Sequence, residues 1–172
     1  RGDLKDLGEH RLRDLSRAER VWQVGGGEFP PLRSLDAART NLPLQLSSFV
    51  GREAELPEIV AASRESRLVT LTGVGGVGKT RLALQVAEEL LPSIADGVWS
   101  VELVPLTDAS LIPQTIASIF GLRELPNLLI IDIITDYLRA KQLLLILDNC
   151  EHLVEACAKL TDHLLRSCPQ LK

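Results

Sequence analysis

The chain has 172 residues, of which 45% are apolar, 24% are charged and only 3% are aromatic. This composition excludes wholesale disorder and predicts about one domain of ordinary size, with a core built from Leu, Ile, Val and Ala. The formal charge of −4 argues against direct contact with nucleic acid or an anionic membrane, because such contacts need clustered positive charge. No run of residues reaches the ~18 apolar positions of a membrane span.

The chain has the features of an internal piece of a longer cytoplasmic protein. It begins with Arg1 and contains no Met, and its N-terminal segment lacks the apolar stretch of a secretory signal. The three cysteines Cys150, Cys157 and Cys168 are an odd number, which favours reduced thiols and therefore a cytoplasmic location.

The sequence predicts three parts. Residues 1–24 contain two short extended segments, 4–15 and 19–24, although the apolar spacing there fits a helix about as well. Residues 25–48 lose all periodicity and are rich in Gly, Pro and Ser, which is typical of a linker. Residues 49–172 regain clear patterns and form the main domain.

Helices and strands alternate in this main domain. Helices are predicted over residues 53–66, 80–91, 110–120, 127–140 and 151–167, and buried strands over residues 68–72, 98–104 and 142–147. The alternation predicts an α/β fold, in which a doubly wound parallel sheet lies between two layers of helices.

A glycine-rich motif, GVGGVGKT, lies between the first predicted strand and the next helix, where a phosphate-binding P-loop (Walker A) would be found. Its glycines allow consecutive backbone N–H groups to curl around phosphate oxygens, and the helix N-terminus favours the same anion. Lys79 would reach the β- and γ-phosphates, and Thr80 would offer its hydroxyl to Mg²⁺. The alternative is a glycine-rich turn with a chance Lys-Thr. The predicted nucleotide-binding residues here are Gly73, Val74, Gly75, Gly76, Val77, Gly78, Lys79, Thr80 and Arg81.

The predicted strand over residues 142–147 is apolar and is followed by Asp148, as in a Walker B motif. Ligands of open α/β sheets bind at the carboxyl ends of the strands, so Asp148 is expected on the same rim as the P-loop. The sequence therefore predicts a site for ATP or ADP with Mg²⁺, in which Lys79 and Asp148 are catalytic and Thr80 and Asp148 hold the metal. The alternative for Asp148 is an ordinary turn residue at a strand end.

With these motifs, residues 41–172 resemble the STAND class of P-loop ATPases, which includes the NB-ARC type. The resemblance rests on residues 42–43 and 49–53, on the P-loop with the strand before it, and on the string LILDNCEH at residues 145–152. That string looks like the bacterial subset found in transcriptional regulators with a LuxR-type helix-turn-helix. The resemblance implies that Val50, Gly51 and Arg52 line the adenine and ribose side of the site.

The resemblance also implies a function. Members of this class act as nucleotide-controlled switches, whose partners are other domains of the same protein and, on activation, further copies in a homo-oligomer. Two departures predict slow hydrolysis: Asn149 stands where a second acidic residue is common, and the sensor Arg is expected only beyond Lys172, in the C-terminal part missing from this chain. In this class the P-loop strand pairs with the strand after Walker B, which is expected only beyond Lys172. Residues 68–72 should therefore pair directly with residues 142–147 or leave an unpaired strand edge.

Residues 6–15 and 19–23 are similar to the tail of a class III nucleotide cyclase domain, such as those fused to ATPases in actinobacterial regulators. None of the metal-binding or purine-binding residues of a cyclase can be assigned in this chain.

The sequence also leaves other functions open. A small-molecule kinase would need a basic lid, and residues 110–140 carry only Arg123 and Arg139 as basic residues. An interaction scaffold that no longer binds nucleotide would not need an intact Lys79, Thr80 and Asp148. The absence of an NKxD motif favours adenine over guanine. The Cys and His residues after position 149 match no zinc signature and fit a core thiol with surface histidines better.

Overall fold

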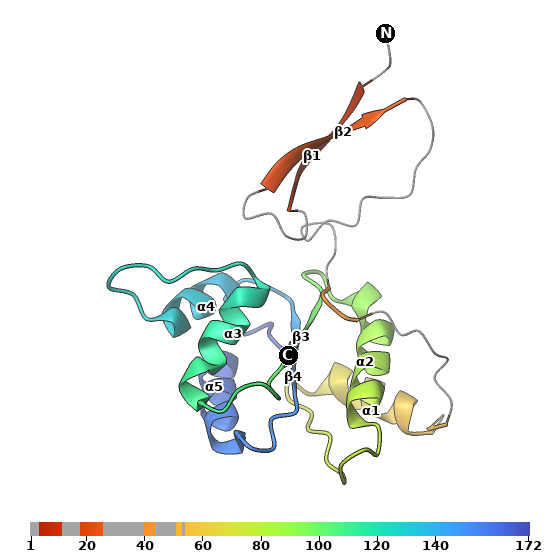
Figure 1. The fold of residues 1–172 in the computed structure, drawn as a ribbon. Helices are drawn as coiled ribbons and strands as arrows, with labels where there is room; N and C mark the ends of the chain where they lie inside the picture. The colour runs from red at the N-terminus through yellow and green to blue at the C-terminus, as the bar shows by residue number, and fades with distance from the viewer. Residues whose placement is uncertain (1–3, 12–17, 26–39, 44–50, 53) are drawn as a thin grey trace.

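A computed structural model describes residues 4–11, 18–25, 40–43, 51–52 and 54–172. These residues form an N-terminal β-hairpin and an α/β domain (Figure 1).

The hairpin consists of β1 (Leu4–Arg11) and β2 (Ala18–Val24), which pair antiparallel with an irregularity between Asp6 and Gly8. The guanidinium of Arg20 in β2 forms an ion pair with Asp6 in β1. Extended structure is therefore confirmed for this segment in preference to a helix, while residues 12–15 of the prediction lie outside the described residues. A two-stranded sheet alone is marginally stable in water.

The α/β domain contains every helix that the sequence predicts, with bounds that differ from the predicted ones by at most three residues. Its helices are α1 (Glu55–Glu65), α2 (Lys79–Leu90), α3 (Ile112–Ile119), α4 (Ile130–Leu138) and α5 (Val154–Ser167), with short 3₁₀ turns at Leu91–Ser93 and Ala109–Leu111. Helix α4 begins three residues later than predicted, because Asn127 has a left-handed φ of 65° and the N-cap residue Leu129 is still extended, with a ψ of 138°. No helix among the described residues is long and apolar enough to cross a membrane.

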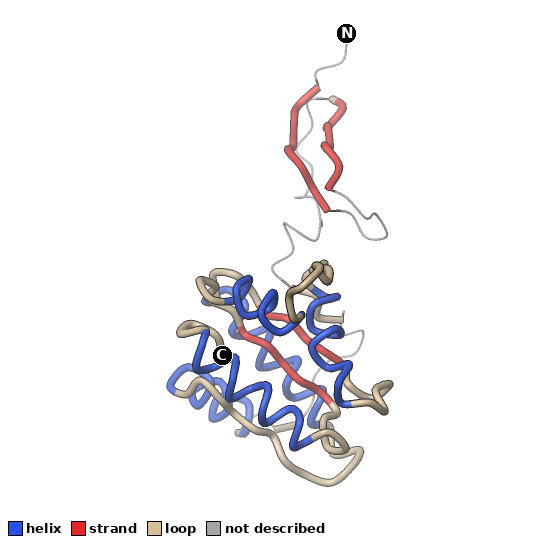
Figure 2. Tube along the Cα trace, turned by 90° about the vertical axis from the view of Figure 1, so that its left-hand side faces the viewer, coloured by secondary structure: helices blue, strands red, loops and turns tan. Residues whose placement is uncertain are grey.

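Two parallel strands, β3 (Val98–Glu102) and β4 (Leu144–Asp148), form the centre of this domain. Successive side chains of a strand point to opposite faces. Val98, Leu144 and Ile146 accordingly pack with α1 and α2, while Trp99, Val101, Leu145 and Leu147 pack with α3, α4 and α5. Figure 2 shows the helices on both sides of the strands. The predicted α/β fold with a parallel sheet between two helical layers is confirmed.

The predicted strand over residues 68–72 is wrong. These residues form no strand in the structure, and the side chains of Leu68 and Val69 are 59% and 36% exposed. The edge of β4 away from β3 is paired instead with the C-terminal residues: Lys172 N–H donates to Leu143 O and Leu145 N–H donates to Lys172 O, both at 2.9 Å. An apolar, β-branched run becomes a strand only where a partner edge is available, and this edge is already occupied.

The segment before the P-loop is held by a pair of cationic side chains instead. Arg67 donates hydrogen bonds to three carbonyls, that of Leu165 in the last turn of α5 and those of Cys168 and Leu171 just after it, over 2.6–3.1 Å. Lys172, just beyond α5, donates in turn to carbonyls at the end of α1. A cation near the last carbonyls of a helix also complements the helix dipole. The two contacts tie α1 to α5 and so fix where the P-loop segment starts.

The outer edge of β3 is also covered. Thr40 forms a parallel bridge with Val98, and the Asn41 side chain pairs with both backbone groups of Ser100 at 2.7 and 2.8 Å. Thr40 and Asn41, which belong to the predicted linker, thus extend the sheet by a short edge segment.

Candidate nucleotide-binding site

The P-loop lies between residue 72 and α2, at the carboxyl ends of β3 and β4 (Figure 1). Gly78 is the N-cap of α2 and has a φ of 88°, which an L side chain rarely adopts. A Cβ on Gly73 would lie 3.2 Å from the Val77 side chain. Among the described residues, the N–H groups of Gly75, Gly76 and Gly78 donate no hydrogen bond. The loop therefore presents a set of unpaired N–H donors at a helix N-terminus, which is the arrangement that binds phosphate.

The side chain of Lys79 folds back onto the start of the P-loop. Its Nζ donates to the carbonyl oxygens of Gly73 at 2.9 Å and Val74 at 3.2 Å. An ammonium held over the mouth of the loop is placed to exchange these carbonyls for phosphate oxygens, which accept stronger, charge-assisted hydrogen bonds.

Thr80 and Asp148 join the P-loop to the end of β4. The Thr80 hydroxyl donates to Asp148 Oδ1 at 3.0 Å, although the two residues are 68 positions apart in the chain. A hydroxyl and a carboxylate are hard oxygen donors, and Mg²⁺ in proteins is held by one or two such groups together with phosphate oxygens and waters. The donor set fits Mg²⁺, with Thr80 and Asp148 as the groups that would hold it.

Asn149 turns back onto Asp148. Its backbone N–H donates to Asp148 Oδ1 at 3.0 Å, its side-chain amide donates to Oδ2 at 3.3 Å, and its φ is 55°. Asn tolerates this left-handed backbone better than most residues. Both carboxylate oxygens of Asp148 therefore accept hydrogen bonds, and the Asn149 amide faces Asp148 rather than the mouth of the loop.

Arg52 reaches the P-loop from the segment before α1. Its Nη2 donates to the Val77 carbonyl at 2.6 Å, and Gly51 and Arg52 both have positive φ values, 83° and 63°. The structure thus brings two of the three residues of the predicted adenine side to the loop, while Val50 lies outside the described residues. Arg81 lies in the first turn of α2.

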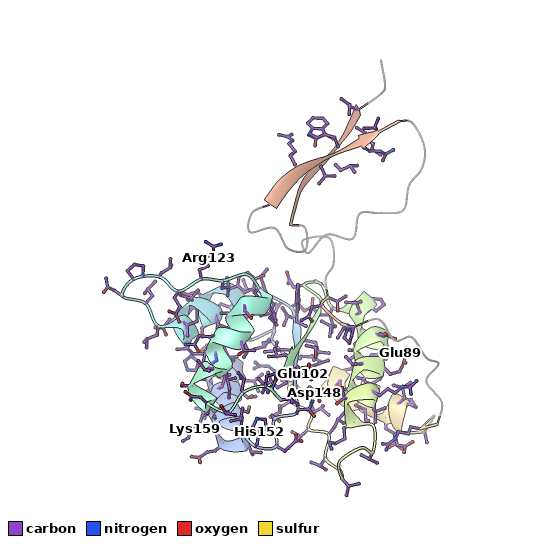
Figure 3. The ribbon with its side chains drawn as sticks, in the orientation of Figure 1. Glu89, Glu102, Arg123, Asp148, His152 and Lys159 are labelled. Atoms are coloured by element: carbon purple, nitrogen blue, oxygen red, sulfur yellow. The ribbon has the colours of Figure 1, made fainter. Side chains whose placement is uncertain are left out.

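Two contacts join the segment that follows β3 to the end of β4 and the residues after it. His152 Nε2 lies 2.7 Å from the Leu106 carbonyl, and Leu103 N–H donates to Asp148 O at 3.0 Å, which continues the β3–β4 ladder by one bond. Figure 3 shows Asp148 and Glu102 together at the ends of their strands, with His152 nearby. Asp148 is therefore held both by Thr80 of the P-loop and by the segment after β3.

Cys157 and Cys168 are buried in the core that packs on α3, α4 and α5, and Cys150 packs against that core. Burial raises the pKa of the Cys157 thiol to about 11, and the neighbouring Cys150 thiol adds to this shift. Burial also raises the pKa of Cys168, whose Sγ–H donates to Thr135 O at 3.7 Å. Among the described residues, no three His, Cys, Asp or Glu side chains come together as a metal site.

These pKa shifts predict the order in which the thiols react. A raised pKa leaves little thiolate at pH 7.5, and the thiolate is the reactive form. Half-buried Cys150 should be alkylated first by iodoacetamide, while Cys157 and Cys168 stay unmodified until pH approaches the raised pKa or the protein unfolds. Peptide mapping by mass spectrometry measures this order. Equal labelling of Cys150 and Cys157 in the folded protein would contradict it.

Comparison with known proteins agrees with this geometry. A family model described as an AAA domain matches residues 62–171, which include the P-loop, Asp148 and the strands and helices around them. The chain belongs to the AAA domain family. The P-loop NTPase fold follows from this membership together with the parallel sheet.

Three relatives give the context in which similar domains are found. An uncharacterized protein of Mycobacterium tuberculosis is 43% identical over 126 residues, which cover 73% of this chain and 32% of the relative. Another M. tuberculosis protein, proposed by its name to be an HTH-type transcriptional regulator, is 43% identical over 107 residues, 62% of this chain and 12% of the relative. A nucleotide-binding leucine-rich repeat (NLR)-like protein of the fungus Hyaloscypha variabilis is 45% identical over 49 residues, 25% of this chain and 5% of the relative.

The chain spans about a third of the length of the first of these relatives. No solved structure matches it.

Proposed function

We propose that this AAA domain binds an adenine nucleotide with Mg²⁺ and acts as a switch, in which the bound nucleotide controls how other domains of the same protein pack. The observation that carries the proposal is the 3.0 Å hydrogen bond between the Thr80 hydroxyl and Asp148 Oδ1. It joins the phosphate-binding loop to the acidic strand end at one point, as a nucleotide–metal site requires.

Binding rests on groups that are already in place. The unpaired N–H groups of the P-loop and the ammonium of Lys79 provide positive charge for the β- and γ-phosphates, and the dipole of α2 adds to it. When bound, Mg²⁺ neutralises charge on these phosphates. Thr80 and Asp148 are the residues that hold it, and Gly51 and Arg52, with Val50, are proposed to line the adenine and ribose.

The link between nucleotide and the rest of the protein runs through Arg52. Its guanidinium holds the Val77 carbonyl at the tip of the P-loop, and its own carbonyl accepts the Leu56 N–H at 3.1 Å in the first turn of α1. A change in the loop on nucleotide exchange therefore reaches the segment that leads to the proposed linker. A ligand shifts a conformational equilibrium only through contacts that differ between the states, and this contact is such a candidate.

The wider context is a bacterial regulator. The resemblance to the STAND class, the NLR-like relative and the relative whose name proposes an HTH-type regulator support a cytoplasmic signalling protein of the LuxR-associated kind. We propose that the hairpin of β1 and β2 is the end of a class III cyclase domain, that copies of the protein assemble on activation, and that this domain itself does not contact DNA.

The switch predicts slow ATP hydrolysis. Phosphoryl transfer depends on a positioned water and on neutralised charge at the γ-phosphate, and the amide of Asn149 is engaged with Asp148. We expect phosphate release by the 172-residue chain, with Mg²⁺ and saturating ATP, at a rate on the order of 10⁻² s⁻¹ or lower. A slow rate keeps one nucleotide state long enough to hold one arrangement of domains. Turnover near the ~1 s⁻¹ of an ordinary kinase would contradict the switch and favour an enzyme.

A further inference from the structure

A carboxylate that the sequence motifs do not mark lies beside Asp148. Glu102 is the last residue of β3, and in the parallel register of β3 and β4 it is the direct partner of Asp148, the last residue of β4. Neighbouring strands are ~4.8 Å apart, so the two backbones are adjacent at the rim. Figure 3 shows the two residues next to each other at the carboxyl ends of the strands.

Both side chains lie on the face of the sheet that carries α2. Side chains alternate along a strand, and Val98 in β3 and Ile146 in β4, which are in phase with Glu102 and Asp148, pack against the core on the α2 side. Since Thr80 at the start of α2 donates to Asp148, this is the face that the P-loop approaches. Glu102 therefore faces the nucleotide site.

The Glu102 carboxylate has no interaction partner among the described residues. It is exposed, and no described donor or cation forms a hydrogen bond or ion pair with it. Asp148, in contrast, accepts hydrogen bonds at both of its oxygens. A charge on an edge strand often serves to prevent edge-to-edge association, but the outer edge of β3 is already paired by Thr40 and Asn41.

We propose that Glu102 is the catalytic carboxylate that orients the attacking water for the slow hydrolysis of ATP. This inference rests on the proposed function. The water oxygen forms a bond to Pγ while the bond from Pγ to the bridging oxygen breaks, and its electron pair leaves with ADP. One proton of the water passes to an oxygen of the γ-phosphate. Glu102 accepts a hydrogen bond from the water before attack, a role for which the Asn149 amide, directed at Asp148, is not placed.

The test compares Glu102→Ala with the matched variant Glu89→Ala. Glu89 is also an exposed glutamate, but it lies near the end of α2 that is far from the P-loop (Figure 3). The readouts are release of ³²P-phosphate in single turnovers with excess protein and Mg²⁺, and the affinity for ADP by calorimetry. We expect Glu102→Ala to slow phosphate release by roughly 100-fold, the cost of losing alignment of the water. ADP affinity should stay within about threefold, which is less than 1 kcal/mol.

The outcomes separate this inference from the proposed function. Unchanged phosphate release in Glu102→Ala, or a loss that only follows weaker ADP binding, would overturn the role of Glu102 and leave the nucleotide site intact. A wild-type chain that binds ATP but releases no phosphate would also overturn it. A wild-type chain that binds neither nucleotide would instead overturn the proposed function. Glu102→Asp should recover part of the rate, because it keeps the charge but shortens the reach, and the melting temperature without nucleotide shows whether each variant is folded.

Discussion

Replacing Lys79 by Ala is expected to weaken ADP and ATP binding by about 10- to 150-fold. The Lys79 ammonium is held at the mouth of the P-loop by the carbonyls of Gly73 and Val74, so its reach to the phosphates costs little reorganisation. A charge-assisted hydrogen bond contributes roughly 1.5–3 kcal/mol, which gives the expected range of affinity. Calorimetric titration with ADP and Mg²⁺ measures the loss directly.

Lys159→Ala is the matched control for this variant. Lys159 lies in α5, where its partner among the described residues is exposed Glu155, so its removal should leave nucleotide affinity unchanged. Because Lys79 also donates to two carbonyls of the P-loop, the melting temperature of Lys79→Ala without nucleotide has to be compared with that of the wild type. Unchanged ADP affinity in a folded Lys79→Ala protein would mean that residues 73–80 do not bind phosphate.

The largest effect on stability is expected from Leu138→Ala. The Leu138 side chain in α4 is completely buried in the core between the sheet and α3, α4 and α5. Its truncation removes apolar burial and leaves a cavity, at a cost of about 2–5 kcal/mol in the free energy of unfolding. Urea unfolding, followed by far-UV circular dichroism, should show a clearly lower midpoint for the variant.

Leu128→Ala makes the same chemical change on the surface. Leu128 lies in the loop before α4 and is 54% exposed, so its truncation should change the free energy of unfolding by no more than about 0.5 kcal/mol. Equal losses for both variants would mean that α4 does not pack on the sheet as described.

The local sequence pattern predicts the helices well, because the backbone hydrogen bonds of a helix join residues that are close in the sequence. The apolar spacing of α2 and α5 marks the buried faces directly, since Val86, Leu90, Leu160 and Leu164 are all buried as expected from one helical stripe. Residues 68–72 have the same kind of apolar signal, yet they form no strand. Whether a strand forms depends on which backbone edge is free, and that is decided by Leu143 and Lys172, far away in the chain.

The nucleotide site divides in the same way. The P-loop and Asp148 are contiguous motifs whose chemistry is visible in the sequence, and the Thr80–Asp148 contact agrees with their predicted meeting point. Glu102 belongs to no motif. Its place beside Asp148 follows only from the register of β3 and β4. A shift of one residue in this register would turn the Glu102 side chain to the other face of the sheet. The contact of Arg52 with Val77 likewise depends on how the chain runs before α1, which the sequence pattern does not show.

The P-loop of this AAA domain is proposed to bind adenine nucleotide together with Mg²⁺. The most direct test is thermal melting of the 172-residue chain with ADP, ATP or GTP, each with and without Mg²⁺. A ligand at 100 times its dissociation constant stabilises the folded state by about 2.7 kcal/mol, so a clear rise in melting temperature is expected. We predict a rise with ADP and ATP that depends on Mg²⁺, is smaller with GTP and is lost in Asp148→Asn when Mg²⁺ is present. No rise with either adenine nucleotide, or an equal rise in Asp148→Asn, would mean that the P-loop and Asp148 do not form a site for nucleotide and Mg²⁺.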